Sequence, residues 1–248
     1  MIRLLADFSP HPPAYGLALE EAIFDAVRTG SRDTLRLWVN ERAVIIGRSQ
    51  SIAAEIDLAQ ARSLAIPVLR RISGGGTVYH YPGNLNVSLT LGDGRSLGRV
   101  GQTFRACGEA LARGLGELAS AITVRENSLF VGDKKIAGAA QARRGDALLY
   151  HSTLLVKPDT IPMERLLCAL NRDYRPIGVA SRPHPTTTLA EASDQNLSLE
   201  EIGPRITAAF CRLLCRPAAA GSLTDDENKR AERLAAEKYG SVEWNHCR

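Results

Sequence analysis

A run of three glycines, Gly74 to Gly76, follows the pair Arg70 and Arg71 after two residues. Consecutive glycines expose backbone N–H groups where a ligand can approach closely, and arginines supply fixed positive charge beside them. This combination predicts an anion-binding loop of the kind that holds a phosphate. The alternative is a glycine-rich hairpin that binds no ligand and has solvent-facing arginines.

The spacing around the glycines excludes two familiar nucleotide-binding loops. The pattern Gly-x-x-x-x-Gly-Lys-Ser/Thr of a P-loop occurs nowhere, and the triple glycine lacks the Gly-x-Gly-x-x-Gly rhythm and the following helix of a dinucleotide-binding fold. Residues 77–81 and 85–91 instead have the composition of two strands, joined by the turn Pro82-Gly83-Asn84. The loop is therefore expected to lie between strands.

Apolar periodicity predicts helices and strands along the whole chain. The expected helices are 15–28, 58–64, 100–116, 198–213 and 225–238, and Thr224 with Glu227 gives the last of these a capping box. The expected strands are 35–39, 43–47, 67–72, 77–81, 85–91, 121–125, 135–143 and 147–157, with 171–190 as an irregular connection. Hairpin-like joins without regular βαβ alternation predict an α+β fold with a mixed, largely antiparallel sheet flanked by helices. A doubly wound parallel sheet is the weaker alternative.

Composition narrows the class of protein. The 248 residues suffice for one compact domain, which is the interpretation adopted here for residues 1–248. The five cysteines form no Cys-x-x-Cys pair, so neither a disulfide framework nor a structural zinc site is expected. The start of the chain shows no signal peptide, and no apolar run approaches the length of a membrane span. A cytoplasmic protein is therefore expected.

The charge pattern bears on partners. The net charge is +4, and acidic residues are interleaved with basic ones, so nucleic acid and membrane partners are not expected. A small anionic ligand or an acidic protein partner fits this balance better.

A second candidate site is the segment 132–144, in which Lys134 and Lys135 precede a run of small residues from Ala137 to Ala140. Small side chains leave room for a long ligand along the strand, and Lys135 is expected to place an ammonium beside it. A basic turn followed by a strand packed closely on a helix is the alternative. Two histidines, His80 and His151, lie near these segments, and for both a hydrogen-bonded core role is favoured over that of a base.

Six segments, taken in chain order, resemble motifs of the lipoate–protein ligase A family, which belongs with biotin ligases and octanoyltransferases. They are Ile-Gly-Arg-Ser-Gln at 46–50, Arg-Arg-x-Ser-Gly-Gly-Gly-x-Val-Tyr-His at 70–80 with Gly-Asn at 83–84, Lys-Lys-Ile-Ala-Gly-Ala-Ala-Gln at 134–141, His-Ser-Thr-Leu-Leu at 151–155, Ser-Arg at 181–182 followed by Leu189, and Lys-Tyr-Gly-Ser-Val-Glu-Trp-Asn at 238–245. The resemblance covers nearly the whole chain.

The resemblance implies a two-step reaction. Lipoate and ATP, with Mg²⁺ assisting, form lipoyl-adenylate and pyrophosphate, and a lysine of an acceptor protein then attacks the adenylate. The acceptors implied are acyltransferase subunits of 2-oxoacid dehydrogenases, the glycine cleavage H protein or another lipoyl carrier. Adenylation builds charge on phosphorus, which fixed N–H donors and a cation stabilise.

Site residues are carried over from the motifs in the same way. Lys135 is the catalytic residue, expected to contact both the lipoyl carbonyl and the α-phosphate. Residues expected to bind ATP or lipoyl-adenylate are Arg71, Ser73, Gly74, Gly75, Gly76, Thr77, Val78, Tyr79, Asn84, Lys135, Gly138 and Ala139; those expected to support them are Arg48, His80, Asn127 and His151. The ligands of the metal ion stay open.

Departures from the family pattern concern the metal and the end of the chain. Tyr81 stands where the family usually has Asp, Ser128 replaces an Asp, and Ala137 and Ala139 replace serines. Larger family members continue beyond the segment that ends here at 238–245 into a small accessory domain. The sequence therefore predicts a catalytic domain without that domain, working with a separate small accessory subunit.

Three alternatives remain beside an ATP-dependent ligase. An ATP-independent octanoyl- or lipoyl-transferase uses a cysteine nucleophile, either just ahead of the lysine strand or near 181–189, and neither place holds a cysteine here. Biotin ligases carry a Gly-Arg-Gly-Arg loop that is missing. A non-catalytic module that binds lipoyl groups is disfavoured because Arg71, the glycines and Lys135 are all retained.

Overall fold

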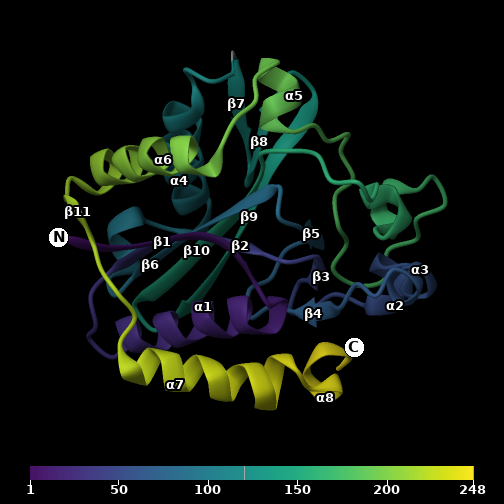
Figure 1. Ribbon diagram of the computed structural model, residues 1–248, viewed down its shortest axis with the longest axis horizontal. Helices are drawn as coiled ribbons and strands as arrows, with labels where there is room; N and C mark the ends of the chain where they lie inside the picture. Colours follow the sequence, from purple (N-terminus) through teal and green to yellow (C-terminus); the bar gives the residue numbers. More distant parts are fainter. Residues whose placement is uncertain (120, 248) are drawn as a thin grey trace.

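The computed structural model describes residues 1–119 and 121–247. The strands are β1 (Ile2–His11), β2 (Thr34–Asn40), β3 (Ala43–Ile46), β4 (Val68–Arg70), β5 (Val78–His80), β6 (Asn84–Leu91), β7 (Ile122–Arg125), β8 (Ser128–Val131), β9 (Lys134–Arg144), β10 (Ala147–Leu155) and β11 (Ala218–Ala220). They form an eight-stranded sheet in the order β11-β1-β2-β6-β10-β9-β8-β7 and a small sheet in the order β4-β3-β5 (Figure 1). In the large sheet β1 pairs in parallel with β11 and β2, and every other pair is antiparallel. The predicted mixed, largely antiparallel sheet is confirmed.

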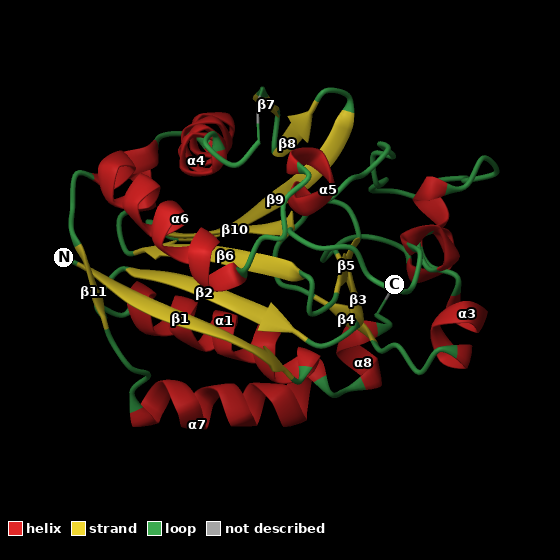
Figure 2. Cartoon of the chain, turned by 45° about the horizontal axis from the view of Figure 1, so that its top comes forward, coloured by secondary structure: helices red, strands yellow, loops and turns green. Residues whose placement is uncertain are grey.

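Helices cover both faces of the large sheet. The α-helices are α1 (Pro13–Arg28), α2 (Ile52–Glu55), α3 (Leu58–Ser63), α4 (Val100–Leu115), α5 (Leu189–Ser193), α6 (Leu199–Leu214), α7 (Asp225–Leu234) and α8 (Val242–Asn245), and the shorter helical turns are η1 (Gly94–Leu97), η2 (Met163–Arg165), η3 (Cys168–Leu170) and η4 (Ala235–Tyr239). Figure 2 shows α4 and α6 on one side of the sheet and α1 and α7 on the other, with the small sheet next to α8.

The core follows this layering because each sheet face buries a separate apolar cluster. Alternate residues of β6 such as Val87 and Leu89 pack with α4 and α6, whereas Trp38 of β2 packs with α1 and the end of α7. A third cluster lies under the small sheet and includes Tyr79 and Tyr81. The capping box of Thr224 and Glu227 is present at the start of α7, as predicted.

Several elements differ from the sequence-based expectation. β1, β8 and β11 were not predicted, and the predicted strand 67–72 is shortened to β4. β1 carries Asp7 and Pro10 and its pairing with β2 shifts between these two residues, so its apolar pattern does not alternate regularly. β8 and β11 are too short to carry a period of their own. The predicted irregular connection 171–190 lacks helices and strands over 171–188, but it is wrong for its last two residues, which begin the unpredicted helix α5 at Leu189.

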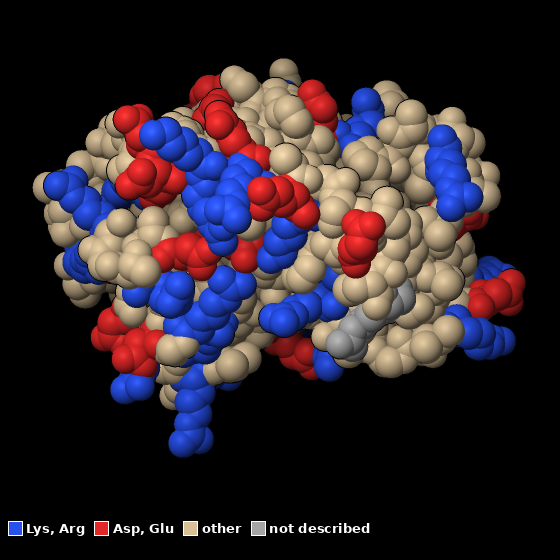
Figure 3. All heavy atoms as spheres, turned by 90° about the horizontal axis from the view of Figure 1, so that it is seen from below, with Lys and Arg blue, Asp and Glu red and all other residues tan. Residues whose placement is uncertain are grey.

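All five cysteines are free thiols. Over the described part of the chain, no helix combines the length and the apolar character needed to cross a membrane. On the face that carries α7, basic and acidic side chains are interspersed (Figure 3).

Candidate active site

A cavity of about 910 Å³ opens where the glycine loop meets the middle of the large sheet. Its walls come from α1, from β2, β6, β9 and β10, from the loop 75–77 and from the segment 179–186, which we call the strap. Strands far apart in the sequence therefore supply one site because they are neighbours in the sheet.

The glycine loop is held in place by Arg71 from beneath. Its guanidinium is buried and donates to Ser73 Oγ at 2.9 Å, to Gly76 O at 2.7 Å and to Gly74 O at 2.5 Å. Burial lowers the pKa of Arg71 to about 10, which leaves the group protonated at neutral pH. Gly75 adopts φ +84°, a conformation that favours glycine. Arg71 thus shapes the loop as well as lining the cavity.

The preceding arginine, Arg70, has a different role from the one that the sequence suggested. It is fully buried and donates to Gly47 O and Gln50 O, each at 2.9 Å, and to Asn245 O at 3.2 Å. Trp244 donates from Nε1 to Arg70 O at 2.7 Å. The expectation that both arginines present charge to a ligand is therefore wrong for Arg70, whose charge joins α8 to the loop 47–50.

Lys135 lies at the start of β9 and is mostly buried, yet among the described residues its ammonium has no hydrogen bond or ion pair. A Cβ built on Gly138 would lie 2.9 Å from Lys135 Nζ, so the side chain runs along the sheet over that glycine. Burial, assisted by the positive charge of Arg71, lowers the pKa of Lys135. An unpaired cation in such a place is suited to an anionic ligand.

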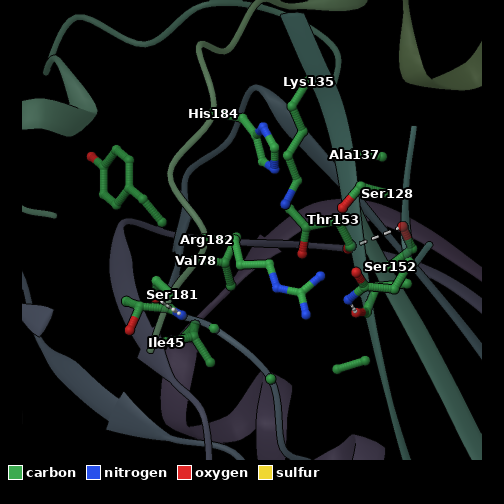
Figure 4. Close-up of a pocket in the computed structure, with 18 of the residues that line it drawn as sticks. Ile45, Val78, Ser128, Lys135, Ala137, Ser152, Thr153, Ser181, Arg182 and His184 are labelled. Atoms are coloured by element: carbon green, nitrogen blue, oxygen red, sulfur yellow. Dashed lines mark hydrogen bonds between the residues drawn. The ribbon is translucent and has the colours of Figure 1, made fainter. Parts of the chain in front are cut away.

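The strap brings two further groups to the same space. Figure 4 shows Arg182 and His184 extending into the cavity toward the side on which Lys135 lies. A backbone hydrogen bond from Lys135 N to Pro185 O at 2.8 Å joins the strap to the start of β9, and Thr187 N, just after the strap, donates to Lys135 O at 3.1 Å. Arg182 also forms an ion pair with Glu126 at the rim.

The strap is attached to the glycine loop through Ser181. Its hydroxyl accepts from Thr77 N at 2.9 Å and from Gln50 Nε2 at 3.1 Å, and donates to Glu55 at 2.5 Å. Glu55 is fully buried and also accepts from Tyr174. Loop and strap therefore form one connected wall.

The two histidines have different surroundings. His80 is buried, burial lowers its pKa to about 3, and it contacts Asn40 at 3.0 Å and Thr153 at 2.9 Å, as a neutral core residue does. His151 lies between Glu20, 2.8 Å from Nδ1, and Ser73, 2.6 Å from Nε2.

Glu20 is the carboxylate of this network. Burial favours its protonated form, but the positive field of His151 and hydrogen bonds from His151 and Ser88 hold the pKa of Glu20 below its usual range. The pair Glu20 and His151 therefore fixes an ionised carboxylate beside the cavity.

Most of the residues predicted for the site line this cavity, and four do not. Lining it are Arg71, Gly75, Gly76, Thr77, Val78, Tyr79, His80, Asn127, Lys135, Gly138, Ala139 and His151. Ser73 is buried beneath the loop, Gly74 and Arg48 lie on the exposed side, and Asn84 donates to Tyr79 O at 2.8 Å. Asn84 and Ser73 hold the loop and strand, and Gly74 and Arg48 are exposed outside the cavity lining, so the binding roles predicted for Ser73, Gly74 and Asn84 and the supporting role predicted for Arg48 stay predictions.

Several residues of the site were not predicted from the sequence. Gln50, Ser181 and Arg182 stand in motifs that were noted but given no role. Glu20 could have been found as an acid on the apolar face of the first predicted helix, although nothing in the sequence indicates its partner His151. No sequence pattern marks Glu55 as a residue of the site.

The family model for the lipoyl protein ligase A/B catalytic domain matches residues 12–211. Among curated proteins, lipoate-protein ligase A subunit 1 of Thermoplasma acidophilum is 30% identical over 98% of this chain and 95% of its own length. An octanoyltransferase LipM of Symbiobacterium thermophilum is also 30% identical, over 97% of each chain.

Solved structures agree with this. A bi-partite lipoate protein ligase from Thermoplasma acidophilum matches with a TM-score of 0.84 and 29% identity, over 98% of this chain and 95% of that one. A T. acidophilum protein with bound lipoic acid has a TM-score of 0.82 at 28% identity, over 99% of each chain. A lipoate-protein ligase A bound with ATP has a TM-score of 0.83 at 29% identity, over 98% of each chain. A biotin protein ligase from Aquifex aeolicus shares the fold with a TM-score of 0.52 at 13% identity, over 86% of this chain and 70% of that one.

Proposed function

Because the chain belongs to the lipoyl protein ligase A/B catalytic domain family, we propose that it attaches lipoate to a lysine of a lipoyl acceptor protein, through a lipoyl-adenylate made from lipoate and ATP. The observation that carries this proposal is Lys135, a mostly buried ammonium that has no partner in the described part of the chain and extends into the cavity beside the glycine loop. Related proteins have been solved with lipoic acid and with ATP, which supports both substrates.

In the first step the ammonium of Lys135 is placed between the carboxylate of lipoate and the α-phosphate. A lipoate oxygen attacks the α-phosphorus, a P–O bond forms, and the bond to the β-phosphate oxygen breaks to release pyrophosphate. Charge grows on the phosphoryl oxygens, and Lys135 with the backbone N–H groups of the glycine loop stabilises it without reorganisation. Arg182 lines the same cavity and adds charge on the side of the strap.

In the second step the neutral amine of the acceptor lysine attacks the acyl carbon of the adenylate. The new amide bond forms as the C–O bond to phosphate breaks, AMP leaves with the electron pair, and the attacking nitrogen releases one proton to water. Lys135 again lies beside the carbonyl oxygen, where negative charge develops. The strand of small residues Ala137 to Ala140 leaves the space that the acyl chain needs.

Mg²⁺ is expected to enter with the phosphates of ATP. Within residues 1–119 and 121–247 there is no cluster of three or more metal-binding side chains. Mg²⁺ is commonly held by substrate phosphates with few protein ligands. ATP and Mg²⁺ are therefore assigned together, as one substrate complex.

The partners are an acceptor and a second subunit. A relative is described as a bi-partite ligase with its E2 lipoyl domain, and we propose the same arrangement here, with a separate small subunit completing adenylation. Acyltransferase subunits of 2-oxoacid dehydrogenases, the glycine cleavage H protein and other lipoyl carriers are the candidate acceptors.

An ATP-independent octanoyltransferase is the second candidate, because a LipM protein is an equally identical relative. A cysteine nucleophile must reach the acyl group. None of the five cysteines lines the cavity, and burial raises the pKa of Cys107 to about 12, which makes its thiolate scarce. These observations favour the ligase.

Pyrophosphate release tests the proposal. The purified chain, with and without the second subunit, is given ATP and Mg²⁺ in the presence and absence of lipoate. A ligase releases pyrophosphate only when lipoate is present, and Lys135→Ala lowers that release about 100–1000-fold, the effect of removing one oriented charge contact. Acyl transfer from an octanoylated carrier protein without ATP would favour the octanoyltransferase instead.

A further inference from the structure

Four residues stand in one row across the large sheet, on the face that forms the cavity. Gly138 of β9 is opposite Thr153 of β10, Thr153 is opposite Asn86 of β6, and Asn86 is opposite Trp38 of β2. Directly opposed residues of antiparallel strands project to the same face, and all four line the cavity. The regular spacing of the strands therefore gives approximate distances between these four residues.

The ammonium of Lys135 lies over Gly138, the first residue of this row. Neighbouring strands are spaced by about 4.8 Å, so Asn86, two strands away, lies about 10 Å from the Gly138 position. Trp38 is one strand further.

The hydrogen bonds of this row have a defined direction. Asn40 Nδ2 donates to His80 Nδ1 at 3.0 Å, so the neutral imidazole carries its proton on Nε2 and donates to Thr153 Oγ1 at 2.9 Å. The hydroxyl of Thr153 then donates to Asn86 Oδ1 at 2.8 Å. Asn86 Oδ1 therefore accepts the hydrogen bond from Thr153, and Nδ2 of the same amide makes no hydrogen bond with Thr153.

That amide nitrogen has no partner among the described residues, although Asn86 is only 2% exposed. Buried donors are nearly always satisfied, and an orphaned one is costly. Since Asn86 lines the cavity, a ligand bound there can satisfy this donor.

The acyl chain of lipoate has the length to reach this donor. Carbon–carbon bonds of about 1.5 Å at angles near 111° advance an extended chain about 1.25 Å per bond, so the ring carbon five bonds from the carboxyl carbon lies about 6 Å away and its sulfurs about 6–8 Å away. With the carboxylate held at Lys135, the dithiolane ring comes beside Asn86. Sulfur is a weak hydrogen-bond acceptor and also contacts aromatic rings favourably, and Trp38 is the next residue of the row.

We propose that Asn86 selects a dithiolane ring over a plain alkyl chain of the same length by donating its Nδ2–H to a ring sulfur, with Trp38 against the far side of the ring. The inference rests on the proposed function, since it places lipoate in this cavity. Octanoate has the same length but no acceptor, so it leaves the donor of Asn86 unsatisfied. A site built around a hydrogen bond discriminates against the analogue that lacks it.

Binding of two non-reactive adenylate analogues tests this. Lipoyl- and octanoyl-sulfamoyl adenosine are titrated calorimetrically into the wild-type protein and into Asn86→Leu, which keeps the side-chain shape but removes the donor. The wild type is expected to bind the lipoyl analogue more tightly. In Asn86→Leu the preference falls about 5- to 12-fold (about 1–1.5 kcal/mol), the worth of one net hydrogen bond.

Thr90→Val is the matched control, because Thr90 is buried on the same strand and the same face but lies outside the cavity. It should keep the wild-type preference. If Asn86→Leu lowers the melting temperature, Asn86→Ala gives the same comparison with a smaller side chain.

The experiment distinguishes failure of this inference from failure of the proposed function. If both analogues bind but the lipoyl preference is the same in the wild type and in a folded Asn86 variant, the inference is overturned and the proposed function stands. If the wild-type protein binds neither analogue, the proposed function fails and the inference with it.

Discussion

Removing the charge of Lys135 should make the protein more stable and inactive at the same time. Lys135→Met keeps the length of the side chain and deletes an ammonium that is mostly buried and has no partner among the described residues. An unsatisfied buried donor costs about 1–3 kcal/mol. Lys135→Met should therefore raise the free energy of unfolding by about this amount at neutral pH, with about 2–4 °C in melting temperature for each kcal/mol.

The gain in stability depends on pH in a defined direction. Burial lowers the pKa of Lys135 from its ordinary 10.5. Between the folded-state pKa and that value the unfolded chain binds more protons, so wild-type stability rises with pH through this window. The destabilisation caused by burying the charge of Lys135 is fully present below the pKa of the folded state and absent above the pKa of the unfolded chain. The advantage of Lys135→Met should therefore shrink as the pH is raised toward 10.5.

The same change should abolish the reaction. Transfer from preformed lipoyl-adenylate and synthesis of that adenylate should each fall about 100–1000-fold, or 2.7–4 kcal/mol. Melting curves at neutral and high pH, together with the two half-reactions, form the assay, and Lys134→Met on the exposed neighbour is the control. A variant of Lys135 with unchanged melting temperature and near-normal turnover would refute the assignment.

Three further changes have defined outcomes. Gly75→Val should remove adenylate binding, because φ is +84° and Arg71 Nη2 lies 3.2 Å from the added Cβ; retained affinity in titration calorimetry would contradict a ligand-facing loop. Glu20→Gln should lose about 1–3 kcal/mol of stability at pH 7. Because the pKa of Glu20 is lowered, that deficit should vanish as the pH falls below the folded-state pKa; a deficit independent of pH in acid denaturation would count against an ionised Glu20. Ser181→Ala should raise KM for ATP more than it lowers kcat, since the hydroxyl joins the strap to Thr77 N; steady-state kinetics with unchanged KM would show that this link is dispensable.

Local pattern was sufficient for the elements that carry the site. The apolar period of α1 and the alternation of polar and apolar residues in β6 specify which residues share a face. The turn before β6 was recognised, but it joins two sheets and closes no hairpin, because β5 pairs with β3 and β6 pairs with β2 and β10. The glycine loop was correctly placed between two strands because its flanks are rich in β-branched and aromatic residues. β1 was missed because a strand near the sheet edge is partly exposed and lacks a clear alternation.

Roles that depend on distant partners could not be predicted. Arg70 satisfies the carbonyls of Gly47 and Gln50 and the end of the chain at Asn245, and no local pattern distinguishes it from Arg71. Glu20 and His151 are 131 residues apart and meet only because α1 crosses the face of β10. Pairing across the sheet, rather than motif spacing, decides which side chains share the cavity.

Transfer of a lipoyl group from lipoyl-adenylate to an acceptor domain is the direct test of the proposed ligase function and of the role of Lys135. The purified protein is mixed with synthetic lipoyl-adenylate and a lipoyl acceptor domain, without ATP, and the acceptor lysine is analysed by mass spectrometry. We expect the wild-type protein to lipoylate this lysine and Lys135→Met to leave it unmodified. An acceptor that stays unmodified with lipoyl-adenylate, yet is acylated from an octanoylated carrier protein, would contradict the proposed ligase function.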